Sequence, residues 1–195
     1  MKNFMKKILH VLNINDFFPE LFELTYPTIK AYADRTGFEI NLITQRKFPD
    51  YPINYEKMQV YEDGEGADYN LLCDADMLIH PHFPDVQSIV KPENVAFNDN
   101  YNISHKYYAD RIKYFVRDGR DVGIATNFVV TSSLTHDLWE PLPLTQKEIA
   151  SLAIPNDREP DEWNRGWGHY ADEFALSFNL AKYGMKYQGI CPEDW

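Results

Sequence analysis

The stretch "LLCDADMLIHP", residues 71–81, decides which fold the sequence predicts. An apolar run typical of a buried strand stops at two aspartates, Asp74 and Asp76, with only Ala75 between them. Side chains two positions apart in an extended segment point the same way, so we expect both carboxylates on one face. In open α/β sheets, ligands bind beyond the carboxyl ends of the strands, and this pair lies at such an end.

Two neighbouring carboxylates without a partner repel each other, and at least one pKa rises. A divalent cation removes this conflict, because Mg²⁺ or Mn²⁺ binds oxygen ligands, usually one or two carboxylates together with substrate phosphates. We therefore predict a metal site formed by Asp74 and Asp76. The alternative interpretation is a pair of solvated charges that opens a turn.

Length and composition indicate one globular domain in a reducing compartment. The chain has 195 residues, of which 44% are hydrophobic, enough for a proper core. A net charge of −11 disfavours a general nucleic-acid partner. Two cysteines, Cys73 and Cys191, do not make a disulfide framework, which favours the cytoplasm. Nothing in the sequence approaches a membrane span of ~20 apolar residues.

Short apolar runs alternate with helical patterns along the chain. Strands are expected at 7–14, 38–44, 69–79, 94–99, 122–133 and 185–190. Helices are expected from residue 17 to a stop at Gly37, over 54–62 with an end at Gly64, within 133–142 and over 171–184. Asp16 is expected to cap the first helix, Pro27 to break or kink it, and 154–170 to be a loop. This order predicts an α/β fold, a single Rossmann-like domain with a mostly parallel central sheet flanked by helices.

Four segments together resemble nucleotide-sugar glycosyltransferases of the GT-A fold, particularly family-eight-like enzymes. They are "TYPTIKAYADRTGFEINLI" (25–43), "YEKMQVYE…ADYNLLCDADMLIHP" (55–81), "ATNFVVTSS" (125–133) and "HYADEFALSFNLAKYG" (169–184). The resemblance covers most of the chain in the right order. It implies one GT-A-type domain over 1–195, with a nucleotide-sugar-binding half at 1–100 and an acceptor-side half at 101–195.

The resemblance implies sugar transfer from a nucleoside-diphosphate sugar, with a UDP-sugar favoured, to a hydroxyl of a glycan or other acceptor. Mn²⁺ or Mg²⁺ held by Asp74 and Asp76 would bridge both phosphates and stabilise the leaving diphosphate. The resemblance also implies that Ala75, between these ligands, belongs to the nucleotide site and that Asp74 contacts the ribose or sugar. Lys57 is expected to face the nucleotide, although a lone helix lysine is otherwise an ordinary surface residue.

Polar residues after the first strand are candidates for reading the base. Asn13, Asn15 and Asp16 carry groups that can hydrogen-bond the edge of a uracil-like base. The alternative is that they only cap the next helix, and for Asp16 capping is the expected single role.

The acceptor side offers candidates for catalysis and sugar contact. Asp172 and Glu173 begin a helix, where the dipole favours carboxylates regardless of function. The resemblance implies that one of them acts near the reacting sugar, as a general base if the enzyme inverts. Asn127, Trp163, Trp167 and His169 are the candidate acceptor or sugar contacts, with the two tryptophans in a loop that could close as a lid. The alternative is a surface loop whose tryptophans pack back on the core.

Two other classes of protein stay open. In a phosphatase of the haloacid dehalogenase type, the first of two such aspartates attacks phosphate and the second handles the proton, but that motif normally opens the chain. A non-catalytic nucleotide-sugar-binding module would keep the aspartates and the aromatic residues and need no base.

Overall fold

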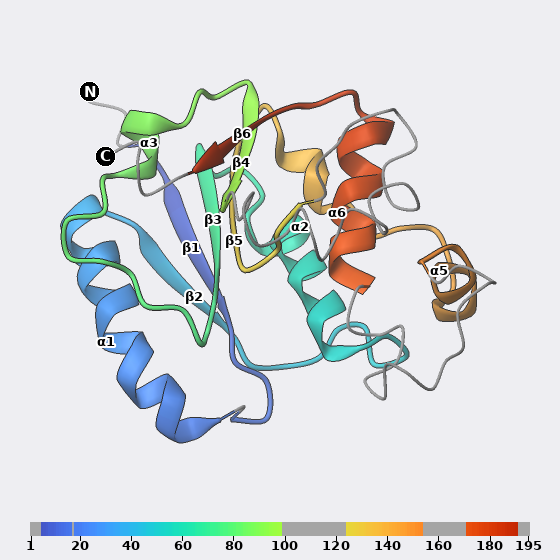
Figure 1. The fold of residues 1–195 in the computed structure, drawn as a ribbon, viewed down its shortest axis with the longest axis horizontal. Coiled ribbons are helices and arrows are strands. Elements are labelled where there is room, and N and C mark those ends of the chain that lie inside the picture. Colours follow the sequence, from blue (N-terminus) through green and yellow to red (C-terminus); the bar gives the residue numbers. More distant parts are fainter. Residues whose placement is uncertain (1–4, 17, 99–123, 154–170, 191–195) are drawn as a thin grey trace.

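A computed structural model describes residues 5–16, 18–98, 124–153 and 171–190. Within these ranges, six strands form one sheet in the order β2-β1-β3-β5-β4-β6 (Figure 1). The strands are β1 (Lys7–Leu12), β2 (Glu39–Ile43), β3 (Tyr69–Asp74), β4 (Asn94–Asn98), β5 (Phe128–Ser132) and β6 (Lys186–Ile190).

Five of these strands point the same way. β1 is parallel to β2 and to β3, and β4 is parallel to β6. β5 is antiparallel to both of its neighbours, β3 and β4. Its first residues therefore meet the carboxyl ends of β3 and β4, where ligands bind in such sheets. The prediction of an α/β fold with a mostly parallel sheet is confirmed. The division into halves at residue 100 stays a prediction, and β5 and β6 from the second half complete the sheet.

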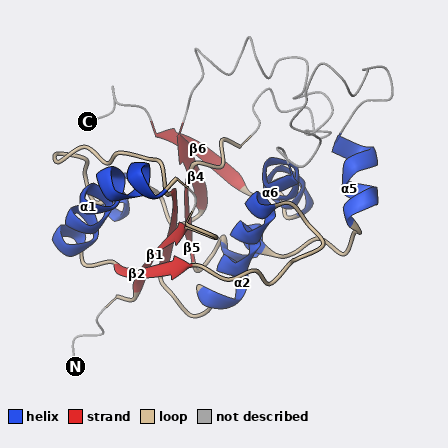
Figure 2. Ribbon diagram, turned by 90° about the horizontal axis from the view of Figure 1, so that it is seen from below, coloured by secondary structure: helices blue, strands red, loops and turns tan. Residues whose placement is uncertain are grey.

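Helices cover both faces of the sheet, as Figure 2 shows from below. α1 (Pro19–Thr36) and α3 (Val86–Ile89) lie on one face. The other face carries η1 (Ile53–Gln59), α2 (Val60–Asp63), η2 (His136–Trp139) and α6 (Ala171–Lys182), with α5 (Gln146–Ala153) packed beside α6. Among the described residues, no helix has the length and apolar composition needed to cross a membrane.

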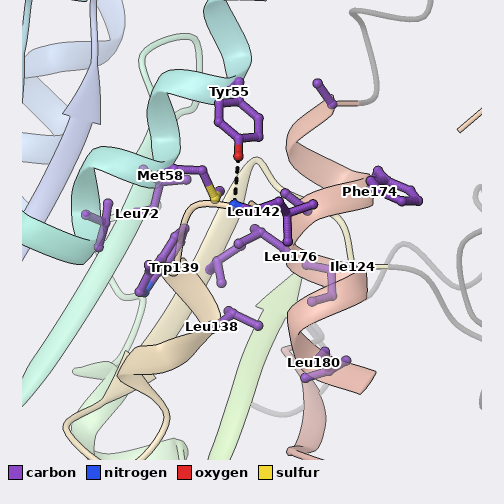
Figure 3. Close-up of a cluster of buried hydrophobic side chains, with 14 of the residues drawn as sticks. Tyr55, Met58, Leu72, Ile124, Leu138, Trp139, Leu142, Phe174, Leu176 and Leu180 are labelled. Carbon is purple, nitrogen blue, oxygen red and sulfur yellow. Dashed lines mark hydrogen bonds between the residues drawn. The ribbon is translucent and has the colours of Figure 1, made fainter. Parts of the chain in front are cut away.

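Successive side chains of a strand point to opposite faces of the sheet and so contribute to two hydrophobic cores. In β3, Leu71 packs with the α1 side and Leu72 with the α6 side, and both are fully buried. The core under α6 contains Trp139, fully buried, and Tyr55 (Figure 3). The Tyr55 hydroxyl accepts a hydrogen bond from the Leu142 backbone N–H at 2.9 Å, so this large side chain keeps its polar end satisfied.

Most predicted elements are present, with differences at their boundaries. Helix α1 continues across Pro27 and ends at Gly37, whose φ of 76° supplies the expected left-handed cap. The segment predicted as a helix over 54–62 is a 3₁₀ helix followed by one α-helical turn, and the expected helix within 133–142 is a 3₁₀ turn. The expected strand 69–79 ends at Asp74. The short helices α3 and α5 were not predicted.

The prediction that Asp16 caps α1 is wrong. The residue before the helix is Phe18, and the structure has no side-chain cap there. Asn15, Asp16 and Phe18 all have positive φ values, of 60°, 47° and 48°. The chain therefore reverses direction through left-handed residues, and Asp16 lies exposed in that turn, before the first helical residue.

A buried polar network ties β1 to its neighbours on the sheet. The fully buried His10 has its Nε2 2.9 Å from Asn70 Oδ1, and its Nδ1 is 3.1 Å from the Asn41 amide nitrogen. Asn70 also donates to the Gly64 carbonyl at 3.1 Å, and a Cβ on Gly64 would lie 2.4 Å from Asn70 Oδ1. A glycine is therefore required here because the Asn70 side chain passes so close. Burial lowers the pKa of His10 to about 4, so the ring is neutral near pH 7.

We expect this histidine to make the fold sensitive to mild acid. In the unfolded chain His10 titrates near 6.5, so the unfolded state binds more protons as the pH falls toward 4. The free energy of unfolding should lose about 2 kcal/mol between pH 7 and pH 5 through this residue alone. Urea unfolding of the wild type and His10→Gln measures the loss, because glutamine cannot take up the proton. A difference between the two proteins that does not change with pH would contradict this assignment.

Candidate active site

A buried lysine lies at the carboxyl edge of the sheet. Helix η1 carries Lys57, which is only 4% exposed. Its ammonium nitrogen is 2.8 Å from Asp74 Oδ1 and 3.0 Å from Asp172 Oδ2, and it donates to the Thr126 carbonyl at 3.1 Å. Burial alone would lower the pKa of Lys57, but the two carboxylates raise it above its usual value. The lysine therefore stays charged. The alternative interpretation of Lys57 as an ordinary surface residue is wrong, and the expectation that it faces the nucleotide stays a prediction.

Asp74, the last residue of β3, is one of the two carboxylates that pair with this lysine. Its backbone N–H donates to the Asn127 carbonyl at 2.8 Å, the point where β5 approaches β3. The side chain is 27% exposed, with Lys57 on Oδ1. Burial raises the pKa of Asp74, and the Lys57 ammonium acts against that rise. One carboxylate oxygen is thus held in the protein interior while the side chain still reaches the surface.

Asp172 is the most enclosed acid of the site. It lies in the first turn of α6 and is 2% exposed. Asn54 donates to its Oδ1 at 2.6 Å, and the Thr126 hydroxyl donates to its Oδ2 at 2.7 Å. With Lys57 as a third donor, both oxygens are engaged. This arrangement suits an acid that holds η1, α6 and the start of β5 together, whereas Glu173, the next residue, is half-buried. Catalysis by either residue stays a prediction.

The two aspartates of the D-x-D segment differ from the expected geometry. Because β3 ends at Asp74, Ala75 and Asp76 lie in a turn and do not continue the strand. The Met77 N–H closes this turn on the Asp74 carbonyl at 3.1 Å, and the Thr25 hydroxyl of α1 donates to the Ala75 carbonyl. The expectation that both carboxylates extend from one face of a strand is therefore wrong. Asp76 is exposed, while Asp74 is partly enclosed by Lys57.

The carboxylates of the D-x-D turn are candidate ligands for a divalent cation, and the metal site stays a prediction. The described residues contain no group of three or more His, Cys, Asp or Glu side chains able to hold a metal. Two carboxylates remain, Asp76 and the oxygen of Asp74 that Lys57 does not engage. This number fits Mg²⁺ or Mn²⁺, which commonly take one or two carboxylates and complete their shell with phosphate and water.

Amide side chains with unpaired oxygens lie near the same edge. Asn13 follows β1, is 6% exposed, and donates its backbone N–H to the Ile43 carbonyl at 2.9 Å. In the described structure, the side-chain oxygens of Asn13, Asn54 and Asn127 are buried and accept no hydrogen bond. Such oxygens cost free energy unless a ligand or water satisfies them, which makes these residues candidates for ligand contact.

The other predicted site residues divide into two groups. Asn15 and Asp16 are exposed in the turn after β1, at the end of the sheet that also carries Asp74. Trp163, Trp167 and His169 lie outside the described residues, and their roles stay predictions. Sequence reasoning missed Asn54 and Thr126. Asn54 belongs to no motif, and Thr126 lies in the segment "ATNFVVTSS" without any local sign of its role. The packing of η1 against α6 brings Asn54 to Asp172, and the chain just before β5 brings Thr126 there.

Comparisons with known proteins add a likeness in fold. No protein-family model matches the sequence, and no curated protein matches it. Among solved structures, the chain is similar to the crystal structure of a glycosyltransferase involved in the glycosylation of the major capsid of PBCV-1. The two are 10% identical with a TM-score of 0.48, over 95% of this chain and 83% of that chain.

We expect Lys57→Met to destabilise the protein by about 3–5 kcal/mol, because it leaves two buried carboxylates without their cation. The loss should shrink as the pH falls from 7 to 5, since burial already raises the pKa of Asp74 and its protonation removes an unpaired charge. Urea unfolding of wild type and variant at both pH values tests both expectations.

Lys30→Met is the matched control, because Lys30 pairs with Asp34 on the exposed surface of α1. It should change stability little at either pH. Equal effects of the two substitutions would show that the Lys57 contacts do not stabilise the fold.

Proposed function

We propose that this protein is a metal-dependent glycosyltransferase that moves a sugar from a nucleoside-diphosphate sugar to a hydroxyl acceptor. One observation carries the proposal. At the ligand-binding edge of an α/β sheet, Asp76 is exposed beside an Asp74 that Lys57 fixes in place. UDP-sugars are the favoured donors, and a glycan or other hydroxyl compound is the acceptor.

Because the site is rich in carboxylates, a nucleoside-diphosphate sugar would need a cation in order to bind there. The carboxylates of Asp74 and Asp172 pair with Lys57, Asp76 follows two positions after Asp74 with no lysine of its own among the ion pairs of the described residues, and the whole chain carries −11. A diphosphate would be repelled by this set unless a positive ion came with it. Asp76 and Asp74 would hold Mn²⁺ or Mg²⁺, which when bound supplies Lewis-acid stabilisation of the leaving diphosphate.

The protein's own residues position the donor. The unpaired, buried amide oxygen of Asn13 is suited to accept a hydrogen bond from a base N–H, as uracil provides. Asn15 and Asp16 extend the same turn toward solvent. Lys57 orients the Asp74 carboxylate and opposes the rise in its pKa that burial causes, and the Thr25 hydroxyl holds the backbone of Ala75.

The two acids of α6 have different parts in the proposal. Asp172 already accepts three hydrogen bonds, so its part is to hold Lys57 and Asn54 in place. Glu173, half-buried in the first turn of α6, is proposed as the general base toward an acceptor hydroxyl. Asn127, Trp163, Trp167 and His169 are proposed to contact the sugar or the acceptor.

The phosphatase alternative fits the order of the chain less well. In a phosphatase of this type the two aspartates normally lie at the start of the chain, whereas β1 and β2 precede Asp74 here. The binding-module alternative differs only in lacking turnover, so it is tested by measuring hydrolysis.

Calorimetric titration with UDP tests the donor site. UDP should bind in the presence of MnCl₂ and lose affinity on addition of EDTA. Asp76→Asn should raise the Kd for UDP with Mn²⁺ at least about tenfold, because it removes one of two carboxylate ligands. Asp137→Asn, an exposed aspartate in η2, is the matched control and should leave the Kd unchanged.

Turnover separates the three classes of protein. Slow release of UDP from UDP-glucose or UDP-galactose with Mn²⁺ supports a transferase, whereas binding without release supports a binding module. Phosphate release from 4-nitrophenyl phosphate supports a phosphatase. UDP binding that neither EDTA nor Asp76→Asn changes would refute the proposal.

A further inference from the structure

An apolar pocket opens directly beyond the D-x-D turn. Its volume is about 290 Å³. Among the described residues, its apolar lining consists of Met77, Leu78, Ile79, Phe83, Phe128 and Ile190. It lies on the α1 side of the sheet, since Ile79, Phe83, Phe128 and Ile190 belong to that core.

Hydrogen bonds and ring contacts hold the walls of this pocket in place. The Ile79 backbone N–H donates to the Thr28 hydroxyl of α1 at 3.1 Å, and Arg35 donates to the Phe83 carbonyl at 2.6 Å. The rings of Phe83 and Phe128 meet edge to face, with centroids 5.5 Å apart. The pocket is thus built before any ligand arrives, which lowers the cost of binding.

The pocket adjoins the proposed donor site. Met77 follows Asp76 directly, and its sulfur lies 3.6 Å from the side-chain nitrogen of Asn127. Phe128 is the next residue after Asn127, and it pairs with Cys73 in the register of β3 and β5. One short segment of β5 therefore borders both the carboxylates and the pocket.

The lining selects the chemistry of the ligand. The described residues around the pocket include no lysine, arginine or acid, and only His80 and Asn98 are polar. A phosphate or a bare sugar would lose its hydration here and find only these two polar side chains among the described lining residues. An apolar cavity of about 150 Å³ takes up benzene, so this volume suits one substituted aromatic ring.

We propose that this pocket binds an aromatic aglycone of the acceptor, with the reacting hydroxyl directed toward the D-x-D turn. The proposal rests on the proposed glycosyltransferase function. With a phenol, the phenolic oxygen bonds to the anomeric carbon as the bond from that carbon to the diphosphate oxygen breaks. The phenolic proton passes to solvent water, and the nucleoside diphosphate leaves with the electron pair of the broken bond.

The experiment uses 4-methylphenol as the probe and the full chain with ¹³C-labelled Met and Ile methyl groups. Titration without a donor should shift the methyl resonances of Met77, Ile79 and Ile190. Leu78→Asp should weaken this binding at least about fivefold, because Leu78 is 68% exposed at the pocket and can accept a charge without unfolding the protein. Leu134→Asp is the matched control, 71% exposed and remote from the pocket, and should leave the Kd unchanged.

Transfer assays then test the role of the bound ring. With a UDP-sugar and Mn²⁺, Leu78→Asp should raise the KM for 4-methylphenol by a similar factor while Mn²⁺-dependent UDP binding stays intact. Methyl resonances that do not move, or equal affinities in the two aspartate variants, would overturn the pocket assignment. Phenol binding beside intact UDP binding but without a glycoside product would overturn the acceptor role. If the wild type does not bind UDP in the presence of Mn²⁺, the proposed function itself is refuted.

Discussion

The ion pairs of Lys57 with Asp74 and Asp172 are the interaction on which the site depends. Taking an ammonium group out of water is costly, and the attraction of two carboxylates offsets that cost only when all three groups keep their geometry. The contacts join η1, β3 and α6, and Thr126 adds the start of β5. The position of the D-x-D turn is therefore fixed by elements from most of the described chain.

The reversed direction of β5 organises the edge of the sheet around this ion pair. β5 is antiparallel to β3, so the chain just before β5 lies at the carboxyl end of β3. Thr126 contacts Asp172 there, and Asn127 contacts Asp74. Phe128 then turns into the core on the α1 side, beside the apolar pocket. A parallel β5 would have placed these residues at the opposite end of the sheet. One antiparallel strand thus supplies both a polar and an apolar neighbour to the D-x-D turn.

Local patterns predicted the elements better than they predicted the contacts. Apolar runs located the strands, and Gly37 marked the end of α1, because both signals act over a few residues. The prediction that Asp74 and Asp76 share one face of a strand was wrong because the strand ends at Asp74. A turn follows, in which the Met77 N–H bonds to the Asp74 carbonyl and the Thr25 hydroxyl bonds to the Ala75 carbonyl. The partners of Asp172 could not be predicted, since Asn54 lies 118 positions away along the chain. Such contacts depend on packing that no local pattern records.

The last described elements of the chain, α6 and β6, complete both the sheet and the ion pairs of Lys57, which has a consequence for incomplete chains. β6 closes the sheet against β4, and α6, just before it, brings Asp172 to Lys57. A nascent chain stopped short of these elements would leave the β4 edge unpaired and the lysine with only one of its two carboxylates. Open strand edges invite association between chains. A chain cut short before α6 would therefore be prone to aggregate through the exposed edge of β4.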